Sequence, residues 1–154
     1  MGEKITPRKV AEYFLSKSEL SPKKIQKLVY YAYAWFITLN NQDPGHIQNV
    51  LFSESPEAWL HGPVFPSLYN EYKKYGWNEV PKHKGNVKFG DSNITAFLDK
   101  IWEVFGGYSA DDLEYMTHQE DPWRNARKGA SPVEYSNNKI STKDIFVYYN
   151  ELSK

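Results

Sequence analysis

The spacing of hydrophobic residues along the chain predicts one dominant helix, over Pro22–Asn40. One apolar arc of this helix carries Ile25, Leu28, Val29, Ala32, Trp35, Phe36 and Leu39, and a second, mostly apolar arc carries Tyr30, Tyr33, Ala34 and Ile37. The polar coverage near its N-terminal end comes from Lys23, Lys24 and Lys27. A helix that is apolar on most sides either runs through the centre of a domain or keeps one side for a partner. We favour the central position, and the partner-facing alternative stays open.

Start signals and further apolar repeats predict several shorter helices. Thr6-Pro7 and Ser21-Pro22 each place an N-cap residue before a proline at the first helical position, where the missing N–H costs nothing. Ser109 and Ser141 are capping residues of the same kind for two later helices. The expected helices, besides the dominant one, run from Pro7 to near Ser18, from Pro66 to before Gly76, over Ile94–Phe105, through Leu113 and Met116, as a turn or helix from Pro122 to Arg127, and from Ser141 to Leu152.

Extended structure is predicted in one short region only. Two apolar runs, Val50–Phe52 and Ala58–Leu60, flank the polar stretch Ser53–Glu57 and predict a small hairpin or extended pair. Residues 78–91 contain proline, glycine and charged residues, which are typical of an exposed loop. Strands and helices do not alternate as they do in parallel α/β proteins. The expected fold class is therefore mainly α, a single compact domain over residues 1–154 of about six helices with a short β-hairpin or extended pair.

The composition narrows the classes of function. The 154 residues include no cysteine, which excludes a disulfide framework, a thiolate zinc site and a cysteine nucleophile. Nineteen Lys and Arg residues balance nineteen Asp and Glu residues, so no overall field attracts nucleic acid or an anionic membrane. No apolar run reaches the roughly 18 residues of a membrane span, and the first residues lack the apolar stretch of a secretory signal. We therefore expect a cytoplasmic protein with no membrane partner, and nucleic acid is not an expected partner.

Aromatic residues form a large share of the chain, with five Trp, eight Phe and twelve Tyr. Such rings serve both cores and protein–protein interfaces. Trp59 and His61 stand at a turn that Gly62 and Pro63 constrain, because glycine permits close approach and proline fixes the backbone. They are either part of a rigid binding surface, or a core ring and a histidine that hydrogen-bonds the turn. Both interpretations stay open.

The stretch Thr117–Trp123 is the one place where the pattern suggests chemistry. His118 lies beside Glu120 and Asp121, a group that can act as acid and base or bind a metal. A helical zinc site needs two histidines four residues apart, whereas the other histidines of this chain are scattered. The sequence also contains no glycine-rich phosphate loop and no nucleophile elbow. Helix capping and a buried hydrogen bond between histidine and carboxylate explain the stretch better, and we expect no catalytic residue, no metal and no cofactor.

Three blocks of the sequence, Lys24–Trp35, Glu57–Pro66 and Thr117–Trp123, together resemble the Panacea antitoxin domain, also called SocA-like, or GepA-like in phage-associated proteins. The resemblance implies an antitoxin of a type II toxin–antitoxin system that neutralises its cognate toxin by direct protein–protein binding. It also implies an alternative, an adaptor that delivers a toxin to a AAA+ protease. An enzyme that depends on His118 and Glu120 is the weaker third alternative.

The expected partner surface combines the second arc of the dominant helix with the constrained turn. It consists of Tyr30, Tyr33, Ile37, Trp59 and His61. The expected partner is the cognate toxin, joined by a AAA+ protease under the adaptor alternative. The resemblance implies no family-wide catalytic set, so no residue is given a catalytic role.

Overall fold

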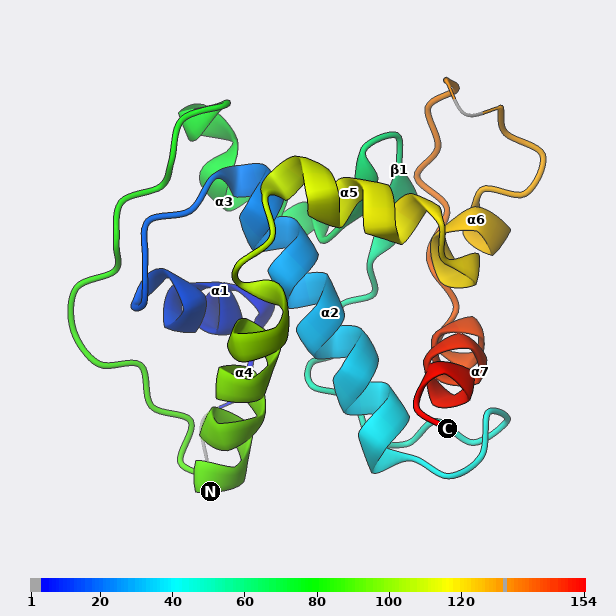
Figure 1. The fold of residues 1–154 in the computed structure, drawn as a ribbon, viewed down its shortest axis with the longest axis horizontal. Helices are drawn as coiled ribbons and strands as arrows, with labels where there is room; N and C mark the ends of the chain where they lie inside the picture. Colours follow the sequence, from blue (N-terminus) through cyan, green and yellow to red (C-terminus); the bar gives the residue numbers. More distant parts are fainter. Residues whose placement is uncertain (1–3, 132) are drawn as a thin grey trace.

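The computed structural model describes residues 4–131 and 133–154, and it is mainly α-helical (Figure 1). Over these residues the chain forms seven α-helices, a short 3-10 helix (η1) and a two-stranded sheet. In chain order they are α1 (Pro7–Leu15), α2 (Pro22–Asn40), β1 (Glu57–Trp59), β2 (Gly62–Val64), α3 (Pro66–Tyr72), η1 (Lys73–Tyr75), α4 (Ser92–Phe105), α5 (Ala110–His118), α6 (Asp121–Ala126) and α7 (Thr142–Leu152). The predicted fold class is confirmed. None of the helices in the described ranges has the length and apolarity that crossing a membrane requires.

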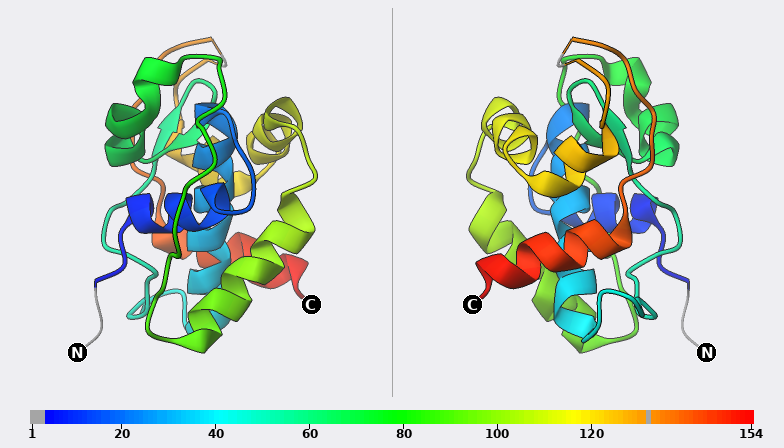
Figure 2. Two further views of the ribbon diagram at one scale, coloured as in Figure 1. Left: turned by 90° about the vertical axis from the view of Figure 1, so that its left-hand side faces the viewer. Right: turned by 90° about the vertical axis from the view of Figure 1, so that its right-hand side faces the viewer.

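Helix α2 lies in the middle of the molecule, and most other elements pack on it. It contacts α1, α3, α4, α5, α7 and β2, and Figure 2 shows α4 and α7 on different sides of its C-terminal half. Tyr30, Tyr33 and Ile37, on the second arc, are at most 2% exposed. The central position that the apolar pattern favoured is therefore confirmed. Leu39, in the last turn, is instead 62% exposed.

Aromatic rings fill much of the space around α2. Tyr31 stacks on Phe105 of α4 with ring centroids 4.3 Å apart. On another side, Tyr33 stacks on Phe52 with centroids 5.2 Å apart. Aromatic pairs of this kind contribute about 0.5–1.5 kcal/mol beyond the area that they bury. A large part of the aromatic content is therefore used in the core.

Capping hydrogen bonds confirm the predicted helix starts. The side-chain oxygens of Thr6 and Ser21 each accept from the backbone N–H three residues later, at the beginning of α1 and α2. Ser109 and Ser141 cap α5 and α7 in the same way. A hydroxyl cap of this type typically contributes about 1 kcal/mol.

Helix α1 ends at Leu15, whereas the pattern predicted an end near Ser18. Beyond the helix, Leu20 exchanges two backbone hydrogen bonds with Val80, with N···O distances of 3.2 and 2.7 Å. The carbonyl oxygen of Leu15 also accepts from the N–H of His83 at 2.9 Å. These bonds fasten part of the segment that was predicted as an exposed loop, and Val80 within it is buried.

The hairpin lies further along the chain than predicted. Strand β1 pairs antiparallel with β2, with Trp59 opposite Gly62. The run Val50–Phe52, predicted as the first strand, is irregular, and two of its three residues are buried in the core. These residues are apolar because they pack on the core, not because they pair in a sheet. A short apolar run by itself does not distinguish the two cases.

Replacing Leu28 by alanine tests the central role of α2. Leu28 is fully buried, so Leu28→Ala removes apolar contacts and leaves a cavity, and we expect the free energy of unfolding to fall by about 2–5 kcal/mol. Leu39→Ala, at an exposed position of the same helix, is the matched control and should change it by less than about 0.5 kcal/mol. Urea denaturation followed by circular dichroism measures both. Equal losses for the two variants would contradict a central α2.

Candidate functional site

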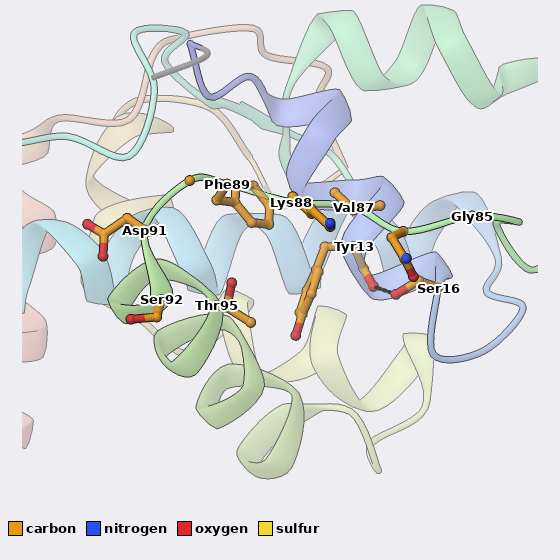
Figure 3. Close-up of a pocket in the computed structure, with 11 residues that line it drawn as sticks. Tyr13, Ser16, Gly85, Val87, Lys88, Phe89, Asp91, Ser92 and Thr95 are labelled. Atoms are coloured by element: carbon orange, nitrogen blue, oxygen red, sulfur yellow. Dashed lines mark hydrogen bonds between the residues drawn. The ribbon is translucent and has the colours of Figure 1, made fainter. Parts of the chain in front are cut away.

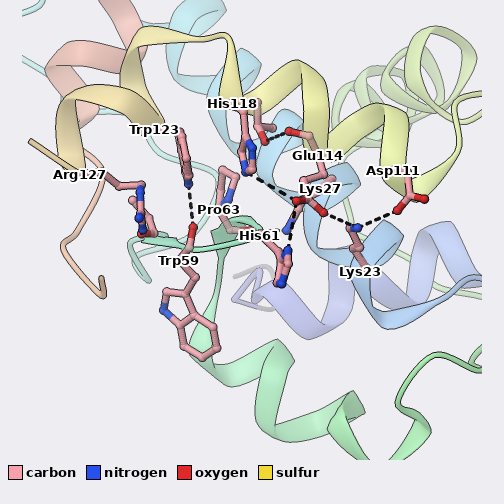
Figure 4. Close-up of polar contacts among 12 residues, drawn as sticks. Lys23, Lys27, Trp59, His61, Pro63, Asp111, Glu114, His118, Trp123 and Arg127 are labelled. Atoms are coloured by element: carbon pink, nitrogen blue, oxygen red, sulfur yellow. Dashed lines mark hydrogen bonds and ion pairs between the residues drawn. The ribbon is translucent and has the colours of Figure 1, made fainter. Parts of the chain in front are cut away.

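The three sequence blocks, far apart in the chain, meet around the β1–β2 hairpin (Figure 4). From α2, Gln26 bonds both backbone groups of Phe65: its Nε2 donates to the carbonyl oxygen at 3.2 Å, and its Oε1 accepts from the N–H at 2.9 Å. From α6, the indole Nε1 of Trp123 donates to the carbonyl oxygen of Trp59 at 2.9 Å. Side chains of the first and third blocks therefore hold the hairpin from both sides.

Arg127, which the sequence analysis did not single out, adds a third attachment to the hairpin. Its side chain is buried, and its Nη1 donates to the carbonyl oxygen of Ala58 at 3.1 Å. The guanidinium carbon lies 4.9 Å from the ring centroid of Trp123. Sequence spacing could not reveal this role, because Ala58 and Arg127 are 69 residues apart.

Lys27 differs most from its expected position. It was assigned to the polar coverage of the helix but is 1% exposed, and its Nζ donates to the carbonyl oxygen of Pro63 at 3.1 Å. Burial penalises the charged amine and lowers the pKa of Lys27 to about 7, while the charges of Glu114 and Lys23 act in opposite directions. The amine is therefore only partly protonated near neutral pH.

The hairpin turn approaches Lys27 closely at position 62, which favours glycine because it has no side chain. Gly62 has a φ of +107°, a conformation that residues with a side chain rarely adopt. A Cβ atom placed there would lie 2.8 Å from Cε of Lys27 and 3.0 Å from Oγ1 of Thr117. Both the backbone conformation and the close contacts therefore disfavour a residue with a side chain at this position.

An ion-pair network lies beside the hairpin turn, centred on Glu114 of α5 (Figure 4). Glu114 pairs with Lys23, and its Oε2 lies 3.1 Å from Nδ1 of His61 and 3.8 Å from Nε2 of His118. Lys23 also pairs with Asp111 at 2.8 Å. Although burial opposes ionisation, hydrogen bonds from Lys23 and His61 hold the pKa of Glu114 below its usual range. The sequence analysis missed Glu114, because only its spacing of four residues from His118 was visible.

His118 and Glu120 do not form the expected histidine–carboxylate pair. Oε1 of Glu120 instead accepts from the hydroxyls of Tyr31 at 3.0 Å and Tyr149 at 2.6 Å. The ring of His118 stacks on Trp123 with centroids 4.0 Å apart. The two side chains separate because His118 ends α5 and Glu120 precedes α6. Within the described ranges, no three histidine, aspartate or glutamate side chains are grouped so as to hold a metal ion.

A groove with a volume of about 290 Å³ opens beside the hairpin turn, and we call it the hairpin groove. Its apolar wall consists of Trp59, Val64, Leu68, Tyr69 and Trp77. Its polar wall consists of Lys23, Gln26, Lys27, His61 and Lys73. The groove is therefore built mainly by the first two sequence blocks together with α3 and η1.

Aromatic rings gather beside the hairpin groove, and most of them are exposed. The ring centroid of Trp59 lies 5.0 Å from that of Tyr69 and 6.1 Å from that of Tyr135. Tyr69 and Tyr135 are exposed, and Trp77 is 87% exposed. We call Trp59, Tyr69, Trp77 and Tyr135 the aromatic rim. Exposed rings gathered beside a groove are typical of protein interfaces.

Two of the five residues predicted for the partner surface lie at this rim. Trp59 belongs to it, and His61 is exposed at the turn. Tyr30, Tyr33 and Ile37 lie in the core, because other elements pack on both arcs of α2. These three helix residues therefore do not belong to the candidate surface.

A second and larger hollow lies between α1, residues 85–91 and the start of α4 (Figure 3). It has a volume of about 560 Å³, and its lining residues all lie outside the three sequence blocks. Its charged lining side chains are Lys88 and Asp91, whose opposite charges favour no class of ligand. The hairpin groove is the better candidate for the functional site.

A comparison with known protein families identifies the family of this chain. The family model described as antitoxin SocA-like, Panacea domain, matches residues 25–124. These residues include nearly all of the three blocks that meet at the hairpin. No significant match is found among curated proteins or among solved structures.

Replacing Gly62 by alanine tests the close approach of the turn to Lys27. Gly62→Ala adds both an unfavourable backbone conformation and a collision, so we expect the free energy of unfolding to fall by more than about 1 kcal/mol. Gly85→Ala is the matched control, because Gly85 also has a positive φ, +95°, but open space where its Cβ would lie. Thermal unfolding measures the difference. A loss no larger at position 62 than at position 85 would contradict the steric requirement.

Replacing Glu120 by glutamine tests the buried carboxyl group. Burial raises the pKa of Glu120 to about 7 from the ordinary 4.5, and the hydroxyls of Tyr149 and Tyr31 offset only part of this effect. The folded protein keeps this proton where the unfolded chain has lost it, so the contribution of Glu120 to stability falls as pH rises from 4.5 to about 7. Glutamine cannot ionise, so Glu120→Gln should gain stability relative to the wild type across that interval. Urea denaturation at several pH values measures the gain, with Glu103→Gln as the exposed control, and a constant difference would refute the prediction.

Proposed function

The chain belongs to the SocA-like antitoxin family with the Panacea domain, and we propose that it is the antitoxin of a type II toxin–antitoxin system. It neutralises its cognate toxin by direct protein–protein binding in the cytoplasm. The binding surface is the aromatic rim together with the hairpin groove. The observation that carries this proposal is the exposure of Tyr69, Trp77 and Tyr135 beside one groove.

The way in which the hairpin is held supports a binding role. The indole Nε1 of Trp59 donates to Oε1 of Glu57 at 2.8 Å, and its backbone carbonyl accepts from Trp123. A ring that is fixed before binding loses little conformational freedom when the partner docks. Trp and Tyr anchors at interfaces often cost about 2 kcal/mol or more when truncated.

The residues that suggested chemistry support binding without turnover. Glu120 is buried beneath two tyrosine hydroxyls, and His118 stacks on Trp123. Both side chains thereby help to hold α5, α6 and α7 around α2. The proposed mode of action is stoichiometric: the antitoxin occludes the toxin or locks its conformation, and no residue has a catalytic role.

Replacing Trp77 by alanine tests the rim. Trp77→Ala removes a ring that is 87% exposed, so we expect the fold to stay intact while toxin binding weakens at least about tenfold. Calorimetry with the toxin encoded by the adjacent reading frame measures the affinity, and co-expression measures the rescue of growth. Val147→Ala is the control, because Val147 is an exposed apolar residue on α7, which contributes nothing to the groove or the rim.

Two results would contradict either the proposed binding surface or neutralisation by occlusion. Unchanged binding and rescue in folded Trp77→Ala and Tyr69→Ala variants would remove the rim from consideration. A fall in toxin level on co-expression of the antitoxin would show delivery to a protease, because occlusion leaves the toxin level intact.

A further inference from the structure

The residues that line the hairpin groove include more basic than acidic side chains, although the chain as a whole is neutral. Nineteen basic and nineteen acidic residues balance over the sequence, but the ionisable groups that line the groove are Lys23, Lys27, Lys73, His61 and the Tyr69 hydroxyl. Among the described residues, no aspartate or glutamate lines the groove. Complementary charge selects partners and speeds their encounter. The groove therefore favours a ligand with a negative charge.

The lysines of the groove differ in how far other groups already compensate their charge. Lys23 is paired with Asp111 and Glu114. The charge of Glu114 also acts on Lys27, whose buried amine donates to a backbone carbonyl oxygen. Lys73 is exposed, and its Nζ lies 5.9 Å from the ring centroid of Tyr69. Lys73 is thus the position at which a carboxylate gains most.

The apolar wall and the size of the groove define the rest of the ligand. The wall contains the rings of Trp59, Tyr69 and Trp77, which suit the face or edge of another ring. A volume of about 290 Å³ lies at the lower end of ligand pockets, which start at about 300 Å³. The groove thus receives one or two side chains and not the face of a helix. Tyr135 extends the apolar surface beyond the groove, which suits a chain that continues past it.

We infer that the hairpin groove binds a short internal segment of the toxin in which an aspartate or glutamate adjoins an aromatic residue. The carboxylate lies against the exposed amine of Lys73 at the edge of the groove, and the aromatic side chain packs on the apolar wall. This inference rests on the proposed function and specifies the chemistry of the partner that the groove recognises.

Titration of the full chain with capped peptides, followed by NMR, tests the inference. The probe is N-acetyl-Gly-Asp-Phe-Gly-amide, and the comparison peptides replace Asp by Asn or Phe by Ala. We expect the probe to shift the indole N–H signals of Trp59 and Trp77 and the amide signal of Gly62. Each comparison peptide should bind at least fivefold more weakly.

A variant that changes the charge of the groove provides a second test of the inference. Lys73→Glu reverses the charge of an exposed lysine at the groove and leaves the buried contacts of the hairpin intact. In this variant we expect the Asp peptide to lose at least fivefold in affinity while the Asn peptide is unchanged. Lys88→Glu, outside the groove, is the matched control and should leave both affinities unchanged.

Four results would overturn the inference. They are equal binding of the Asp and Asn peptides, equal shifts with sodium acetate alone, tighter binding of a peptide whose only carboxylate is its free C-terminus, and no shift of the groove signals. Toxin neutralisation by the wild type does not depend on these titrations. A failure here with intact rescue of growth would therefore refute the acidic–aromatic ligand and leave the antitoxin function standing.

Discussion

The hydrogen bond from the Lys27 amine to the Pro63 carbonyl oxygen fixes the hairpin turn against the central helix, and the geometry of the site depends on it. The turn can reach a buried lysine because Gly62 leaves room for the lysine stem. With the turn in this position, the carbonyl oxygen of Trp59 meets the indole of Trp123. Three segments that are remote in sequence thus meet at one place, and the rings they carry acquire defined positions on the surface.

The parts of the fold that could be predicted are those that local chemistry determines. Serine or threonine before a helix start identified α1, α2, α5 and α7, because the cap satisfies backbone groups within the same turn. The two apolar arcs of α2 likewise indicated a central helix. The position of the hairpin was wrong, since the apolarity of Val50–Phe52 reflects core packing and carries no information on strand pairing.

The site was less predictable, because its contacts join residues that are distant in the chain. Trp59 and His61 were identified from a ring and an imidazole beside a constrained turn. Lys27 was not, because a lysine near the start of a helix normally faces water, and its partner lies 36 residues further along. Glu114 joins α2, α5 and the hairpin in one network, and nothing in its own neighbourhood of the sequence indicates that.

The exposed rings and the hydrogen bonds that hold the hairpin are, to a large extent, carried by different residues. Gln26, Lys27 and Arg127 hold the backbone of the hairpin from inside, whereas Trp77 and Tyr135 stand in solvent. Exchange of a solvent-exposed side chain usually costs little folding energy. The surface residues can consequently change in evolution while the residues that hold the hairpin stay the same. A change of specificity from one binding partner to another therefore need not pass through variants that fold poorly.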